Sequence, residues 1–186
     1  SNKILIVTHE FPDLDAIGSS LALYLQLKAQ KKEVVIWSSQ KLDSTFDFLP
    51  HVKDIQHDYP KNFNFDTIIV LDSSNLSRVR NHHLIKVVPD KTQVINIDHH
   101  DDNDEFGDLN IVQSISSVGE LLVSIFETLK WQITDEMATC LYAAISFDTG
   151  RFAYSNVTEK TLKRAGTLIS LGASAYKISQ KIDENK

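Results

Sequence analysis

The chain has 186 residues, of which 42% are hydrophobic and 24% are charged, and its net charge is −6. This is the composition of an ordinary globular protein, and the length suits one domain, so a disordered chain is excluded. The acidic balance argues against long duplex DNA as a partner, because neutralising its phosphates requires a basic stripe.

Four short runs rich in β-branched residues predict buried parallel strands over 4–7, 34–37, 67–71 and 94–97. These runs mostly lack the polar alternation of a sheet with one solvated face. A helix with apolar residues on more than one side is expected over 16–31, after the first run. The alternation of strands with helices predicts the α/β class, with a doubly wound, mainly parallel sheet and helices on both of its faces.

The segment 41–64 has mixed polarity and two prolines, which indicates a loop with a short helix. Beyond the strands the chain is predicted to be helical, beginning with residues 118–129, whose apolar positions are spaced for one buried stripe. Three further helices are expected over 135–147, 159–171 and 175–182. Each follows a hydroxyl residue suited to capping its start: Thr134, Thr158 and Ser174.

Acidic and histidine residues follow three of the predicted strands directly. They are His9, Asp13 and Asp15 after the first strand, Asp72 after the third, and Asp98, His99 and His100 after the fourth. Ligands of open parallel sheets bind beyond the carboxyl ends of the strands, so we expect these side chains at one edge. Asp148, which follows a predicted helix instead of a strand, is a further candidate for this site.

Several carboxylates repel one another in a small concave site unless cations lie between them. Imidazole and carboxylate ligands without a thiolate favour Mn²⁺, Mg²⁺ or Co²⁺ over a structural Zn²⁺ ion. The number of groups exceeds what one octahedral ion needs, and it suits two ions roughly 3.5–4 Å apart that share a carboxylate. Such a pair activates a water molecule and stabilises the transition state of phosphoryl transfer.

Each of these residues has an ordinary explanation when it is taken alone. An aspartate after a strand or helix is a common turn former, and a histidine pair is often merely exposed. His82 and His83, which have no acidic neighbour after a strand, are interpreted as such an exposed pair. The functional hypothesis depends on the coincidence of so many candidate ligands at one sheet edge.

Three further features carry weaker signals. The stretch Ser116-Ser117-Val118-Gly119-Glu120 opens a predicted helix, where backbone N–H groups can bind a phosphate, although an ordinary N-cap explains it equally well. Cys140, the single cysteine, lies in an apolar helical run and is expected in the core. No apolar run approaches the roughly 20 residues of a membrane span, so we expect a cytoplasmic protein without a membrane partner.

Four motifs stand in order along the chain: His9-x-x-Pro12-Asp13-x-Asp15-Ala16, Leu71-Asp72-Ser73-Ser74, Ile97-Asp98-His99-His100 and Phe147-Asp148-Thr149-Gly150. Together they resemble the motifs of the DHH phosphoesterases, and the resemblance covers essentially the whole chain. Within that family, residues 16–23 and 106–110, Asn103 and Ser117-x-Gly119-Glu120 look like the branch of nanoRNases and 3′-phosphoadenosine-5′-phosphate phosphatases. Ser73-Ser74 replaces the His-Asn pair that family II pyrophosphatases usually carry, which argues against that branch.

The resemblance implies two bound divalent ions, both Mn²⁺, with Asp72 as the bridge between them. Its implied ligand sets are His9, Asp13 and Asp72 for one ion, and Asp15, Asp72, His99 and Asp148 for the other. By the same resemblance, Asp98 orients a ligand imidazole, His100 contacts the scissile phosphate, and Asn103 joins His100 in binding the substrate.

The implied reaction is hydrolysis of a phosphate ester by a water molecule that the two ions activate. The implied substrates are short oligoribonucleotides or adenosine 3′,5′-bisphosphate. A phosphodiesterase of cyclic or linear dinucleotides and a non-catalytic nucleotide-sensing domain are the alternatives. We expect residues 1–171 to form the catalytic domain and residues 172–186 to begin a linker helix toward a second domain, which this chain lacks. The sequence does not decide whether the chain forms a homodimer.

Overall fold

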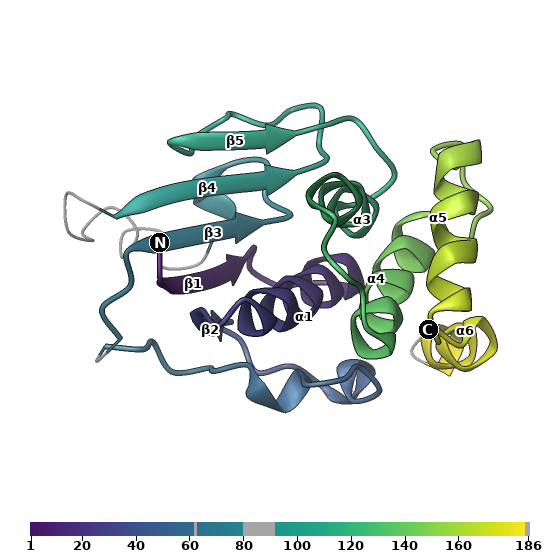
Figure 1. The fold of residues 1–186 in the computed structure, drawn as a ribbon, viewed down its shortest axis with the longest axis horizontal. Coiled ribbons are helices and arrows are strands. Elements are labelled where there is room, and N and C mark those ends of the chain that lie inside the picture. Colours follow the sequence, from purple (N-terminus) through teal and green to yellow (C-terminus); the bar gives the residue numbers. More distant parts are fainter. Residues whose placement is uncertain (62, 80–91, 185–186) are drawn as a thin grey trace.

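The computed structural model describes residues 1–61, 63–79 and 92–184. A five-stranded parallel sheet with the order β2-β1-β3-β4-β5 forms its centre (Figure 1). The strands are β1 (Lys3–Thr8), β2 (Glu33–Trp37), β3 (Thr67–Leu71), β4 (Gln93–Asp98) and β5 (Leu109–Val112). The α/β class and the four predicted strands are confirmed. His82, His83 and the last two residues of the expected linker segment lie outside the described residues.

Strand β5 was not predicted. It is a four-residue edge strand that pairs only with β4, and none of its side chains is fully buried. The parallel strands recognised from the sequence are continuous apolar runs because both of their faces are covered. A short edge strand interrupted by Asn110 carries no such signal.

Both faces of the central strands are buried, as their unbroken apolar runs require. Ile4 and Ile6 of β1 join the larger core cluster, whereas Leu5 and Val7 point to a smaller cluster on the opposite face. Within the described residues, the α-helices contribute only to the larger cluster, and the short 3₁₀ helix η3 (Leu76–Arg78) packs against the smaller one. Loop residues such as Tyr59 contribute to the smaller one.

The helices form successive layers on the face of the larger cluster (Figure 1). Helices α1 (Leu14–Ala29) and α3 (Val118–Leu129) contact the sheet, and α4 (Asp135–Asp148) packs on both. Helices α5 (Glu159–Ser170) and α6 (Ala175–Glu184) pack against the far side of α4. None of the described helices is long and apolar enough to cross a membrane.

The predicted starts of α3, α4, α5 and α6 agree with the structure. Thr134 Oγ1 accepts a hydrogen bond from the Met137 amide, and Thr158 exchanges hydrogen bonds with Thr161 in a capping box. Cys140 is fully buried in α4, which confirms its core position. Two 3₁₀ helices, η1 (Ser44–Phe46) and η2 (Val52–Asp54), occupy the mixed segment where one short helix was expected.

Gly18 allows α1 to approach α4 closely, and we expect Gly18→Ala to destabilise the protein. A Cβ atom at this position would lie 2.6 Å from the backbone oxygen of Cys140. Such overpacking typically lowers the free energy of unfolding by about 1–3 kcal/mol, which exceeds the helix-propensity gain of about 1 kcal/mol. Urea denaturation measures the change.

Gly166→Ala is the matched control, because this α5 position is exposed and nothing lies within 4 Å of an added Cβ. Its expected effect is a gain in the free energy of unfolding of up to about 1 kcal/mol. Equal effects of the two substitutions would contradict the close packing of α1 on α4.

Candidate active site

Strands β1, β3 and β4 end side by side. Thr8 pairs with Leu71, and Leu71 pairs with Ile97. The next residues along these strands, His9, Asp72 and Asp98, therefore lie at one edge of the sheet, as the sequence predicts. The neighbouring loops and helices bring the remaining candidates to the same edge: Asp13, Asp15, His99, His100 and Asp148.

Asp13 fixes the turn between β1 and α1. Its Oδ1 accepts hydrogen bonds from the amides of Asp15 at 2.9 Å and Ala16 at 3.0 Å, which makes Asp13 the N-cap of α1. The helix consequently begins at Leu14, two residues before the predicted start. Asp15 thus occupies the first helical turn and is fully buried.

The N-terminus of α3 binds the carboxylate of Asp15. The Val118 amide donates to Asp15 Oδ2 at 2.7 Å, and the Gly119 amide donates to Oδ1 at 2.8 Å. The hypothesis that these helix-start amides bind a phosphate is therefore not supported, because an aspartate of the protein already occupies them. The positive end of the helix dipole stabilises the Asp15 carboxylate as it would a phosphate, because a helix N-terminus favours any anion.

Two imidazoles present the same ring nitrogen to the centre of the site. His9 Nδ1 lies 2.8 Å from the Glu10 carbonyl, and His99 Nδ1 lies 3.1 Å from the Ile115 carbonyl. Because a carbonyl only accepts hydrogen bonds, each Nδ1 carries the proton and each Nε2 is left for another partner. Metal-ligating histidines have this arrangement.

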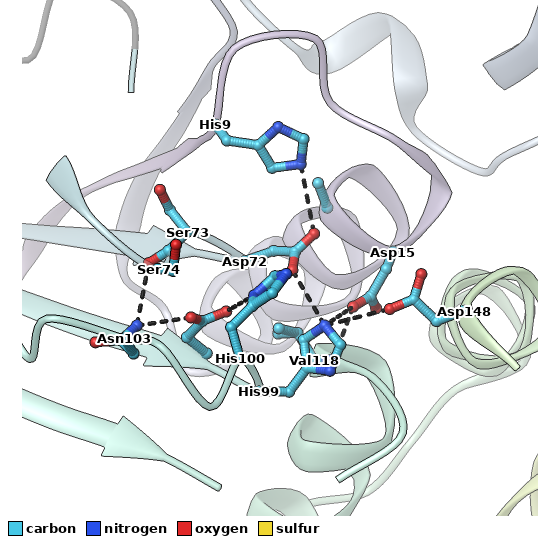
Figure 2. A network of polar contacts seen from close by, with 12 residues as sticks. His9, Asp15, Asp72, Ser73, Ser74, His99, His100, Asn103, Val118 and Asp148 are labelled. Carbon is cyan, nitrogen blue, oxygen red and sulfur yellow. Dashed lines mark hydrogen bonds and ion pairs between the residues drawn. The ribbon is translucent and has the colours of Figure 1, made fainter. Parts of the chain in front are cut away.

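Asp72 lies between the two imidazoles (Figure 2). Its Oδ2 is 3.5 Å from His9 Nε2, and its Oδ1 is 3.5 Å from His99 Nε2. Oδ1 is buried and has no hydrogen-bond partner among the described residues. A buried carboxylate oxygen without a donor is costly, so this atom fits a bound cation.

The charges of the site also favour cations. Burial and the neighbouring carboxylates raise the pKa of Asp15 to about 7 and that of Asp148 to about 9. Burial alone would lower the pKa of His99, but its acidic neighbours, Asp72 foremost, raise it to about 10. Without a metal, the cluster retains protons to limit the repulsion between its carboxylates. Divalent ions would replace these protons on binding.

Among the residues that the structure describes, three groups have the donor atoms to hold an ion. In each group, the candidate ligand atoms lie within 4.8 Å of one another. The groups are His9 with Asp13 and Asp72, Asp15 with His99 and Asp148, and Asp72 with His99 and His100. The first group is the same as the first expected ligand set. The second group differs from its expected set only in lacking Asp72, although Asp72 Oδ1 does face His99 of that group.

The structure gives specific partners to Asp98 and Asn103. Asp98 was expected to orient a ligand imidazole, and the imidazole that it contacts is that of His100, whose Nδ1 donates to Asp98 Oδ1 at 2.8 Å. Asn103 was expected to bind substrate, but its Nδ2 donates to Asp98 Oδ2 at 2.6 Å and to the Ser73 carbonyl at 3.2 Å. Its Oδ1 accepts from Asn96 and Glu105. The Asn103 amide therefore holds Asp98 and has no free position for a substrate.

The family model described as the DHH family, N-terminal domain, matches residues 3–145. This chain belongs to the DHH family. Two curated relatives are named bifunctional oligoribonuclease and PAP phosphatase NrnA. The one from Thermus thermophilus is 35% identical over 96% of this chain and 53% of its own length. The one from Bacillus subtilis is 32% identical over 100% of this chain and 58% of its own length.

Two solved structures share the fold of this chain. An exopolyphosphatase-related protein from Bacteroides fragilis superposes with a TM-score of 0.90 at 31% identity, covering 97% of this chain and 56% of that protein. A putative family II inorganic pyrophosphatase from Methanococcus jannaschii, at 17% identity and a TM-score of 0.71, shares the fold. The DHH chain thus spans a little over half the length of the relatives it matches.

The sequence did not reveal the partners that orient the candidate ligands of this DHH chain. The Ile115 carbonyl and the amides of Val118 and Gly119 are backbone groups, so no residue type identifies them. The one available signal was the N-cap pattern at Ser117, which located the helix start but not the anion bound there.

Proposed function

We propose that this chain is the catalytic domain of a two-metal phosphoesterase that hydrolyses short oligoribonucleotides and adenosine 3′,5′-bisphosphate. The observation that carries the proposal is the position of Asp72, whose two oxygens face two separate His/Asp groups. The names of the curated relatives support the choice of substrates. In this proposal residues 1–171 form the domain, residues 172–186 begin a linker, and the location is the cytoplasm.

The proposed ligands of the first ion are His9, Asp13 and Asp72. Those of the second are Asp15, Asp72, His99 and Asp148. Oxygen and imidazole donors without a thiolate suit Mn²⁺. When bound, a pair of such ions supplies an activated water and charge stabilisation for displacement at phosphorus.

His100 is the residue that we assign to the substrate phosphate. Its Nδ1 is held by Asp98, which is itself fully buried, and this hydrogen bond raises the pKa of His100. When the ring is protonated, Nε2 is a second donor at the partly exposed rim of the site. A donor that faces the negative charge developing on phosphate stabilises the transition state.

Removal of metal is expected to abolish phosphoesterase activity, because the attacking water in the proposed mechanism is activated by the bound ions. The protein is treated with a chelator, freed of it, and assayed on a short RNA, adenosine 3′,5′-bisphosphate and cyclic di-AMP before and after Mn²⁺ is restored. Recovery on the first two substrates is expected. Activity that persists after verified metal removal would contradict the two-metal mechanism.

The substrate panel also separates the alternatives. Preferential hydrolysis of cyclic di-AMP would favour a dinucleotide phosphodiesterase. Nucleotide binding by the Mn²⁺-loaded protein without any turnover would favour a sensing domain.

A further inference from the structure

Residues 115–119, the segment that leads into α3, contact two members of the Asp15–His99–Asp148 group directly. The Ile115 carbonyl accepts the hydrogen bond from His99 Nδ1 at 3.1 Å. The amides of Val118 and Gly119 bind the two oxygens of Asp15 at 2.7 and 2.8 Å. One short segment therefore sets both the tautomer of the imidazole and the orientation of the carboxylate.

Asn156 connects the third member of the group to the same segment. Its Nδ2 donates to the Ser116 carbonyl at 3.3 Å and to the backbone carbonyl of Asp148 at 3.1 Å. Asp148 is the last residue of α4, so this contact ties the end of that helix to the segment 115–119. All three candidate ligands thus depend on one stretch of backbone.

A buried glutamate holds the segment in place. Glu120 is 1% exposed, and its Oε2 accepts hydrogen bonds from Ser116 Oγ at 2.5 Å and Thr161 Oγ1 at 2.9 Å. Its Oε1 accepts from Arg164 at 3.0 Å. Because both partners beyond Ser116 come from α5, this network fixes the segment against that helix.

The His9–Asp13–Asp72 group is oriented by other means. His9 donates to the neighbouring Glu10 carbonyl, and Asp13 caps its own helix. Both contacts are local to residues 9–16, which lie in a different part of the chain from the segment 115–119. Apart from Asp72, which faces both groups, the candidate ligands of the two ions therefore have separate orienting contacts.

We propose that Asn156 and Glu120 are positioning residues for the Asp15–His99–Asp148 ion alone. They act through the segment 115–119 and leave the His9–Asp13–Asp72 ion unaffected. This inference rests on the proposed function, since it presumes that both positions bind metal. Loss of a group that orients metal ligands typically weakens metal affinity about 10–100-fold.

The test is a Mn²⁺ titration of the metal-free protein, in which the electron paramagnetic resonance signal of free Mn²⁺ is measured at each addition. Asn156→Ala removes the tie to Asp148 at an exposed position, and Ser116→Ala removes the tie to Glu120. In each variant we expect one binding step to weaken about 10–100-fold while the other is unchanged. Ser155→Ala, an exposed neighbour, is the control and should bind as the wild type does.

Double variants distinguish positioning from general destabilisation. The effect of Asn156→Ala on Mn²⁺ affinity should vanish in a His99→Ala background and persist in a His9→Ala background. The inference would be overturned if both binding steps weakened equally, or if Asn156→Ala and Ser116→Ala bound Mn²⁺ as the wild type does. The proposed function would still stand in either case, provided that the wild type binds Mn²⁺ in two steps. A wild-type protein that binds no Mn²⁺ would overturn the proposed function and the inference together.

Discussion

Replacing Asp72, by asparagine or by alanine, is expected to lower metal occupancy more than a substitution at any other residue of the site. Each oxygen of Asp72 faces a different His/Asp group, so its loss removes a ligand from both proposed ions and the anion that shields them from each other. Asparagine keeps the shape of the side chain and tolerates the left-handed backbone at this position, where φ is 55°. Asp72→Ala should lower occupancy further, because it leaves no oxygen at the bridging position.

Metal content after gel filtration, measured by mass spectrometry, checks the expectation. The variants should lose at least one of two equivalents, with turnover falling in parallel. Asp102→Ala is the control, because it removes the same charge from an exposed position shortly after the Asp98-His99-His100 triplet. Two full equivalents retained in Asp72→Ala would refute the bridging role.

The sequence predicted the arrangement of the site because the fold obeys a simple rule. Continuous β-branched runs identify buried parallel strands, and the residues that follow such strands share one edge. His9, Asp72 and Asp98 were placed together on that basis, and the pairing of Thr8, Leu71 and Ile97 confirms it.

The same rule does not predict hydrogen bonds between residues that are far apart in the sequence. Asp15 is bound by amides more than 100 residues away in the chain, and nothing in its local sequence indicates them. The sequence did not identify the imidazole that Asp98 contacts, because two adjacent histidines cannot be told apart before their side-chain directions are known. Helix α1 begins two residues earlier than predicted because Asp13 caps it. The sequence around Asp13 resembles a turn, so this capping role was not recognised.

His100→Ala and His99→Ala are expected to fail in different ways, although the two residues are adjacent. His99 Nε2 faces the carboxylates of Asp15, Asp72 and Asp148, whereas His100 Nδ1 is bound by Asp98. His99→Ala should therefore lose one metal equivalent and most of the turnover together. His100→Ala should retain both equivalents and lose turnover about 100-fold or more, the typical cost of removing one donor to the transition-state charge.

Metal content and turnover must be measured on the same samples, so that a lost ion is not mistaken for a lost donor. Asp98→Asn supplies an independent variant, because it weakens the support of the His100 ring and leaves the partners of the His99 ring in place. It should reproduce part of the His100→Ala defect at full metal occupancy. His51→Ala removes an exposed imidazole that pairs with Asp54 away from the site, and it should leave both quantities unchanged.

If His100→Ala loses an ion and His99→Ala does not, the assignments are reversed, and the group of Asp72, His99 and His100 then becomes the relevant ligand set. If neither substitution changes metal content or rate, the triplet does not belong to the active site.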